Sequence, residues 1–319
     1  MIELQGHAPD EQGGADRRHK DNDPGRKGGR EFRIRPAIAL ERYLLMGCSP
    51  RPGGNSDTAL GLFSQSFERT ILLRARAGSS APDGRSEPEP LDERSSNRLR
   101  RTEGPGGTKG PAQAADAPCC AEAGAALSRF GLRSVFLRDH RVLPCVGCDC
   151  CKEMTEALVN GGPPYGFMPF GCPLTAKDDS AALLRSFVSA RGLCLVAPIY
   201  FYHLPAGFKG LLDRMQPFWN LHAAGGRHLA EQPERVCRVI LLGARKKGQK
   251  LFEGALLTLR HAFAPLRVRL AEPLLLRGLD GPEDLRRHEE HRQAIMDYAE
   301  DAAHELWTGA GAKGAVYAP

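Results

Sequence analysis

Short apolar runs alternate along this chain with longer segments in which apolar residues recur at helical spacing. Five runs are apolar almost throughout: Tyr43–Met46, Arg133–Leu137, Leu193–Ala197, Val236–Leu242 and Val268–Leu276. A strand that is apolar on both sides belongs in a parallel sheet covered on both faces. The helical segments are 55–67, 179–192, 207–218, 251–259 and 282–306. The alternation predicts an α/β fold, a three-layer doubly wound domain with a five-stranded parallel sheet.

In such a sheet, ligands bind beyond the carboxyl ends of the strands. The loops that follow the first, third and fourth predicted strands are Gly47–Asn55, Pro198–Leu204 and Gly243–Lys250. We therefore expect these three loops to converge at one edge of the sheet.

Three segments lack the apolar pattern of a packed domain. Residues 1–36 are polar and Gly-rich, residues 74–118 consist largely of Gly, Pro, Ser, Arg and Glu, and the last residues, 309–319, are rich in Gly and Ala. Such segments bury too little apolar surface to offset the entropy of ordering. We expect a disordered tail at 1–36, one domain at 37–308 with a disordered insertion at about 74–118, and a loose tail at 309–319.

Charge and hydropathy narrow the functional classes. The chain has 44 basic and 38 acidic residues, which are interspersed, so the sequence does not favour a nucleic-acid surface. It has no apolar run of membrane-spanning length, and the N-terminal residues have no apolar signal-peptide core. We expect a cytoplasmic protein that binds neither nucleic acid nor a membrane. Ten cysteines in such a protein favour thiols or metal ligands over disulfides.

The first predicted loop suits a phosphate group. In the sequence LLMGCSPRPGGNSDTAL, a strand is followed by a Gly- and Pro-rich turn and then by a helix start. The start of a helix offers unpaired backbone N–H groups and the positive end of the helix dipole. The loop lacks both common nucleotide fingerprints, G-x-G-x-x-G and the P-loop. The alternative interpretation is that its Ser, Thr and Asn residues only cap the helix.

Cysteines cluster between the second and third predicted strands. Cys145, Cys148 and Cys151 have the spacing of three cluster ligands in bacterial ferredoxins, and Cys172 is followed by proline, as the remote ferredoxin ligand is. A [4Fe–4S] cluster, a zinc ion and unmetallated thiols all remain open from spacing alone. Cys150 leaves the register ambiguous, because it could replace Cys151.

Together, these motifs resemble a known family. GCSPRPGGNSDTAL is similar to the phosphate loop of the flavodoxin-like NAD(P)H-dependent FMN reductases, and APIYFYHLPAGFKGLLDR is similar to the second signature of that family. The segment CVGCDCC…GCPLTAKDDS resembles the iron–sulfur flavoprotein branch. The resemblance implies a flavodoxin-like sheet with strand order 2-1-3-4-5. This chain departs from the family in Cys48, in the insertion, and in the 20 residues between Cys151 and Cys172.

The resemblance also implies a set of cofactor contacts. The residues expected around the FMN phosphate are Ser49, Arg51, Asn55, Ser56 and Thr58. The residues expected along the flavin ring are Pro198, Ile199, Tyr200 and Phe201, with free backbone N–H groups facing the ring. The metal ligands would be Cys145, Cys148, Cys151 and Cys172. For the aromatic loop, the alternative is a half-buried loop or a dimer contact.

The expected function is that of an FMN-dependent oxidoreductase. It would take electrons from NAD(P)H and pass them to a flavin, a quinone or an iron–sulfur acceptor, with no protein acid or base required. The basic residues Arg245, Lys246, Lys247 and Lys250 could meet the phosphates of the dinucleotide, or could form a plain surface loop. The alternative is an electron carrier that works with a ferredoxin-like protein and does not oxidise NAD(P)H. A homodimer is expected from the resemblance.

Overall fold

The computed structural model of this protein describes residues 43–79, 130–160, 172–225, 233–309. All of them belong to one compact unit that spans 35–319. The predicted tails except Gly309 and most of the predicted insertion lie outside the described residues. So do residues 121–129, whose sequence AEAGAALSR also predicts a helix.

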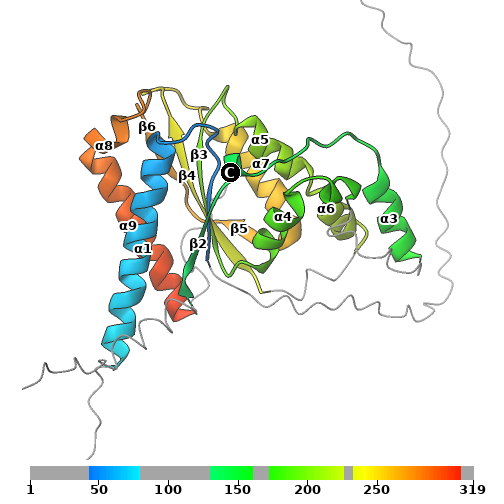
Figure 1. Cartoon of the computed structure of the whole chain (residues 1–319), viewed down its shortest axis with the longest axis horizontal. Coiled ribbons are helices and arrows are strands. Elements are labelled where there is room, and N and C mark those ends of the chain that lie inside the picture. Colours follow the sequence, from blue (N-terminus) through cyan, green and yellow to red (C-terminus); the bar gives the residue numbers. More distant parts are fainter. Residues whose placement is uncertain (1–42, 80–129, 161–171, 226–232, 310–319) are drawn as a thin grey trace, which may run out of the picture. The chain divides into compact units, whose positions relative to one another are not determined.

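A parallel sheet of six strands forms the centre of the described structure (Figure 1). The strands are β1 (Tyr43–Gly47), β2 (Leu132–Phe136), β3 (Leu193–Pro198), β4 (Arg235–Gly243), β5 (Val268–Leu270) and β6 (Leu274–Arg277). The sheet order is β2-β1-β3-β4-β5, and β6 pairs with β4 beyond β5. This order is the flavodoxin-like order 2-1-3-4-5, so the predicted fold class is confirmed.

The predicted fifth strand is interrupted at Glu272 and Pro273. Val268–Leu270 pairs with the start of β4, and Leu274–Arg277 pairs with its end. Proline has no backbone N–H to donate to a ladder, which accounts for a break at this position in an otherwise apolar run. Both pieces occupy the fifth position of the sheet.

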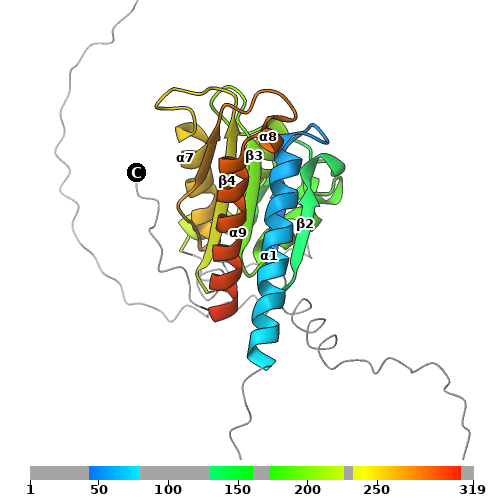
Figure 2. The same ribbon diagram turned by 90° about the vertical axis from the view of Figure 1, so that its left-hand side faces the viewer.

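Helices cover both faces of the sheet, because alternate residues of each strand point to opposite sides. One face packs against α1 (Asn55–Ser79), α8 (Asp284–Arg287) and α9 (Glu289–Thr308). Figure 2 shows α1 and α9 side by side across this face. The other face packs against α4 (Ser180–Ser189), α5 (Ala206–Asp213), α6 (Gln216–Ala223) and α7 (Glu253–Phe263). Leu45 and Val196 belong to the first core, and Met46 and Leu195 to the second, as the alternation requires.

Three helices differ from their predicted extent. The first helix continues to Ser79, beyond the predicted start of the insertion at residue 74. The helix predicted at 207–218 is divided into α5 and α6, and Pro217 in the first turn of α6 starts a new helix there. The helix predicted at 282–306 is divided into α8 and α9, because His288 has extended backbone angles.

A further helix lies among the clustered cysteines. Helix α3 (Cys150–Val159) begins at Cys150 and packs against α6. The sequence did not predict it. This helix matters for the site, because the adjacent side chains of Cys150 and Cys151 point in different directions from it.

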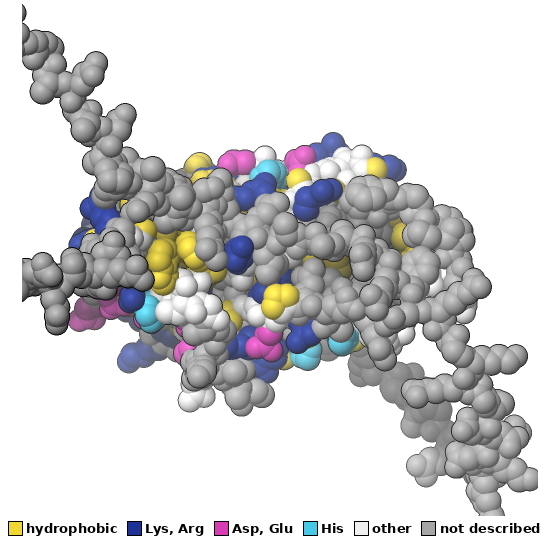
Figure 3. All heavy atoms as spheres, turned by 90° about the horizontal axis from the view of Figure 1, so that it is seen from below, with side chains coloured by type: hydrophobic (Ala, Val, Ile, Leu, Met, Phe, Trp, Pro, Cys, Tyr) yellow, Lys and Arg dark blue, Asp and Glu magenta, His cyan; other side chains and the backbone are white. Residues whose placement is uncertain are grey.

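The distribution of charge on the surface agrees with the interspersed basic and acidic residues of the sequence. On the face shown in Figure 3, Lys and Arg side chains alternate with Asp and Glu over the described residues. Within the ranges that the structure describes, no helix is long and apolar enough to cross a membrane.

Candidate functional site

The three loops predicted to converge do so at the carboxyl edge of the sheet. Gly47 at the end of β1 pairs with Phe136 and Val196, and Pro198 at the end of β3 pairs with Leu242. Two hydrogen bonds continue the ladders into the loops, from Cys48 N to Val196 O at 2.9 Å and from Ile199 N to Leu242 O at 2.8 Å. The loops after β1, β3 and β4 therefore start from neighbouring positions.

The loop after β1 ends in an open helix terminus. The backbone N–H groups of Gly54, Asn55 and Ser56 donate no hydrogen bond within the described part of the chain. Gly53 has a φ of 73°, a conformation that glycine adopts without strain, and a Cβ on Gly54 would meet no heavy atom within 4 Å. Unpaired N–H groups beside open space are what an anion needs, so this terminus fits a phosphate group.

Asp57 shapes the loop, and its charge is compensated. Its carboxylate accepts the Gly53 N–H at 2.7 Å and pairs with the Arg138 guanidinium at 2.8 Å. Arg138 in turn lies 4.3 Å above the centre of the Phe136 ring. An unpaired carboxylate here would repel a phosphate group, and Arg138 removes most of that penalty.

The predicted phosphate residues divide into two groups. Arg51 is exposed and Thr58 is half-buried. Ser49 is buried, and its hydroxyl bonds to the backbone of Arg51, while Ser56 is also buried. Asn55 is engaged elsewhere, because its amide donates to Gly281 O at 2.8 Å and accepts from Leu285 N at 2.9 Å. Asn55 thus fastens the loop to the segment before α8.

The aromatic loop after β3 forms a two-residue hairpin turn. Tyr200 and His203 exchange backbone hydrogen bonds of 2.9 Å in both directions, and Phe201 and Tyr202 between them have φ of 49° and 63°. Turns with two positive φ angles usually carry Asn-Gly. Two aromatic residues in the left-handed region cost about 1–2 kcal/mol each, and strain of this kind clusters at functional sites.

The hairpin is held against α7 and the basic loop. The Leu204 N–H donates to Nδ1 of His203, so Nε2 carries the proton and donates to the Thr258 hydroxyl at 2.9 Å. Tyr202 accepts a hydrogen bond from Arg245, which also lies 5.6 Å from its ring centre. These contacts fix a strained turn at the same edge of the sheet as the open helix terminus, since β1 and β3 are neighbours.

The predicted flavin wall differs from the prediction in its backbone N–H groups. Pro198, Ile199 and Tyr200 are half-buried, whereas Phe201 is fully exposed at the tip of the turn. The N–H groups of Ile199 and Tyr200 are not free, because they bond to Leu242 and His203. The expectation of free N–H groups was wrong for these two residues, since sheet and hairpin pairing already use them.

The four predicted cysteine ligands line one cavity of about 350 Å³. Cys145, Cys148, Cys151 and Cys172 contribute to its wall, and Cys150 does not. Burial raises the pKa of the Cys151 thiol, and the neighbouring Cys172 and Cys145 thiols raise it further. The cavity therefore favours Cys151 over Cys150 in the predicted ligand set.

Two nitrogen donors point at cysteine sulfur atoms of this cavity. Arg214 Nε lies 3.1 Å from Cys172 Sγ, and Asn220 Nδ2 lies 3.4 Å from Cys151 Sγ. The sequence reasoning did not single out either residue, although Arg214 is the last residue of the second signature. Hydrogen bonds to ligating sulfurs are typical of cluster sites. Within the described ranges, no three His, Cys, Asp or Glu side chains are grouped closely enough to hold a single metal ion.

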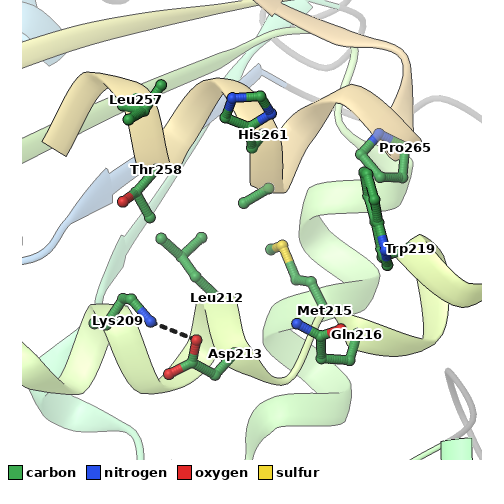
Figure 4. A pocket seen from close by; sticks show the side chains of 11 residues that line it. Lys209, Leu212, Asp213, Met215, Gln216, Trp219, Leu257, Thr258, His261 and Pro265 are labelled. Atoms are coloured by element: carbon green, nitrogen blue, oxygen red, sulfur yellow. Dashed lines mark hydrogen bonds and ion pairs between the residues drawn. The ribbon is translucent and has the colours of Figure 1, made fainter. Parts of the chain in front are cut away.

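A second cavity of about 550 Å³ lies between α5, α6 and α7 (Figure 4). Trp219 stands at one end, and Leu212, Met215 and Leu257 contribute apolar walls. Asp213 and Gln216 line both cavities, so the two are neighbours. Lys209 and Asp213, four residues apart on α5, pair at 2.5 Å.

Comparison with known proteins gives partial sequence matches. An iron–sulfur flavoprotein of Methanocaldococcus jannaschii is 32% identical over 94 residues, which is 29% of this chain and 40% of that protein. An iron–sulfur flavoprotein of Methanosarcina thermophila is 25% identical over 85 residues, 27% of this chain and 36% of that protein. The chain thus matches well under half the length of these relatives. No protein-family profile matches it.

Among solved structures, an NAD(P)H:quinone oxidoreductase from Methanothermobacter marburgensis covers 84% of this chain and 96% of its own, with 14% identity and a TM-score of 0.47. That likeness is too distant to transfer a function. The fold class follows from the sheet order, and the partial sequence matches are independent of this likeness. This chain has a flavodoxin-like fold, and part of it is similar in sequence to iron–sulfur flavoproteins.

Proposed function

We propose that this chain is an FMN-dependent oxidoreductase that takes electrons from NAD(P)H and passes them to a flavin, a quinone or an iron–sulfur acceptor. The observation that carries the proposal is the meeting of two features at one sheet edge. Unpaired N–H groups of Gly54, Asn55 and Ser56 suit a monophosphate, and the Tyr200–His203 hairpin supplies an aromatic wall. The names of the two sequence relatives, both iron–sulfur flavoproteins, support a flavin and a cluster.

In this proposal the protein supplies binding and position. The terminus of α1 holds the phosphate, with Arg51 and Thr58 adding a charge and a hydroxyl. Pro198, Ile199 and Tyr200 would line one edge of the ring, with the fully exposed Phe201 at the tip of the turn. When bound, FMN would supply the redox chemistry, accepting a hydride and releasing electrons singly or in pairs.

The basic loop after β4 is suited to the electron donor. Arg245, Lys246 and Lys247 are exposed, and Arg245 contacts Tyr202 of the hairpin. Cationic side chains beside the flavin wall would attract the phosphates of a nicotinamide dinucleotide. We propose this loop as the NAD(P)H contact.

The cysteine cavity is the proposed site of a [4Fe–4S] cluster. Its donor set fits the group, because four cysteines line one cavity and N–H donors face two of the sulfurs. Cys145, Cys148, Cys151 and Cys172 would be the ligands. This cavity is also the observation that favours the second candidate, an electron carrier for a ferredoxin-like partner without NAD(P)H oxidation.

Rapid mixing with NADPH separates the two candidates. Anaerobic protein loaded with FMN is mixed with NADPH, and the flavin absorbance is followed. Bleaching of the flavin band on the timescale of turnover supports the oxidoreductase. A flavin band that persists with NADPH and NADH, but bleaches with reduced ferredoxin, supports the carrier. Light scattering on the same sample tests the proposed homodimer.

A further inference from the structure

Cys172 lies far along the chain from the other proposed ligands, and the structure shows what holds it in place. Twenty residues separate it from Cys151, and it is nevertheless buried in the wall of the shared cavity. Arg214 donates from Nε to its sulfur at 3.1 Å. Arg214 comes from the junction of α5 and α6, 42 positions later in the chain.

The rest of the Arg214 guanidinium reaches the other end of the cysteine segment. One terminal nitrogen donates to Leu143 O at 2.9 Å and to Asp178 at 2.9 Å, and the other donates to the Ser180 hydroxyl at 3.0 Å. Leu143 precedes Cys145 by two residues. One planar group therefore joins the start of the cysteine segment to its last ligand.

Asp178 completes the arrangement from the opposite side. Its carboxylate accepts the Leu143 N–H at 2.7 Å and both the N–H and the hydroxyl of Ser180. The side chains of Arg214 and Asp178 are fully buried. A buried ion pair is weak evidence for stability, because an apolar pair often stabilises a fold as well. Its position at the cavity points to a role in geometry.

We infer that Arg214 is a positioning residue for the cluster, which holds Cys172 at the cavity and donates a hydrogen bond to its sulfur. The inference rests on the proposed cluster. Arg214 would hold Cys172, the ligand farthest along the chain, close to the other three. Hydrogen bonds to a ligating sulfur favour the more negative, reduced form of a cluster. Arg214 therefore raises the reduction potential of the cluster as well as retaining it.

Asn220 supplies an internal comparison. It donates to Cys151 at 3.4 Å, but it is only half-buried and has no second link to the cysteine segment among the described contacts. Removing its amide should shift the potential in the same direction by a smaller amount, and should not speed the loss of the cluster.

The test compares full-length wild-type protein with Arg214→Lys, Asn220→Ala and the exposed control Arg191→Gln, all reconstituted anaerobically with iron and sulfide. Arg214→Lys keeps the charge beside Asp178 but loses the planar fork. We expect iron loss to a chelator about tenfold faster and a one-electron midpoint potential lower by about 59 mV, which is a tenfold shift of that equilibrium. Arg191→Gln should match the wild type in both measurements.

A measurement on wild-type protein makes the test independent of folding in the variant. Protein labelled with ¹⁵N-arginine is reduced, and pulsed electron–nuclear spectroscopy looks for a nitrogen coupled to the cluster. A coupled arginine nitrogen supports the inference. The inference is overturned if that coupling is absent. It is also overturned if Arg214→Lys has the wild-type midpoint potential and the wild-type rate of iron loss. Neither result contradicts the proposed cluster. Wild-type protein without iron and sulfide after reconstitution overturns the cluster itself, and the inference with it.

Discussion

The amide oxygen of Asn55 accepts a 2.9 Å hydrogen bond from the backbone N–H of Leu285, which lies 230 positions later in the chain. The same amide donates to Gly281. Asn55, the last residue of the loop after β1, thus also links α1 to the segment that contains Gly281 and Leu285. This link suggests that loop shape and fold stability depend on one side chain.

Replacing Asn55 by alanine should lower both stability and FMN affinity. The change leaves the Leu285 N–H and the Gly281 carbonyl without their partner, which costs about 1–3 kcal/mol. Urea unfolding measures the loss of stability, and flavin fluorescence quenching measures the affinity. The control is Gln65→Ala on the exposed side of α1, which should change neither. If Asn55→Ala is as stable as the wild type, the hydrogen bonds of Asn55 to Gly281 and Leu285 contribute nothing to the free energy of unfolding.

Removing the charge of Arg51 should weaken binding of FMN but not of riboflavin. Arg51 is exposed beside the open helix terminus, and only FMN carries the phosphate. We expect about a tenfold weaker FMN affinity, equal to about 1.4 kcal/mol, and a smaller effect at high salt. Fluorescence titrations with both ligands give the comparison, and Arg69→Ala on α1 is the matched control. An equal loss for riboflavin would place Arg51 away from the phosphate.

The strained hairpin should lower the stability of the fold while its aromatic residues raise the affinity for FMN. Changing Phe201 to Asn and Tyr202 to Gly provides the residues that this turn ordinarily uses, and it should stabilise the fold by about 1–3 kcal/mol. The same change removes the aromatic tip, so FMN affinity should fall. Thermal unfolding without flavin and a fluorescence titration measure the two effects. A double variant that is less stable than the wild type would mean that the two aromatic residues pack favourably in the turn.

The ion pair of Asp178 should make stability depend on pH in the acid range. Burial alone would raise the pKa of this carboxyl, but hydrogen bonds from Ser180 and Leu143, together with Arg214, hold the pKa below its ordinary value. A lowered folded pKa contributes stability above the unfolded pKa of about 3.9, and that contribution is lost as pH falls through the folded value. Asp178→Asn should therefore be less stable than the wild type at pH 7, and the difference should shrink below about pH 4.

Urea unfolding of both proteins without metal, from pH 7 down to pH 3, measures this difference. Asp179→Asn at the neighbouring exposed position serves as the control. If the difference in stability between Asp178→Asn and the wild type stays constant with pH, the charge of the Asp178 carboxylate is not the source of that difference.

The strands were predictable because each lies in a short run that is apolar almost throughout, and the loops at their ends followed from parallel topology. The break at Pro273 was predictable in principle, since proline cannot complete a ladder. The division between α5 and α6 was also predictable in principle from Pro217, although Leu211, Leu212 and Phe218 keep a helical pattern across it. Arg214 lies at this division, and its side chain is buried.

The candidate site was predictable only where motifs are local. The spacing of Cys145, Cys148 and Cys151 indicated ligands, but the preference for Cys151 over Cys150 depends on α3. The Arg214–Cys172 and Asn220–Cys151 contacts join positions 42 and 69 residues apart. Such pairs arise from tertiary packing, and periodicity in one sequence carries no information about them.

The central claim is that FMN binds at the edge formed by Gly54–Ser56 and the Tyr200–His203 hairpin. The most direct measurement is a titration of anaerobically purified full-length protein with FMN, followed by flavin fluorescence and the visible spectrum. The account predicts quenching that saturates near one FMN per chain, and weaker binding in Arg51→Ala. Flavin fluorescence that does not change on mixing, in protein that carries no flavin after purification, would contradict it.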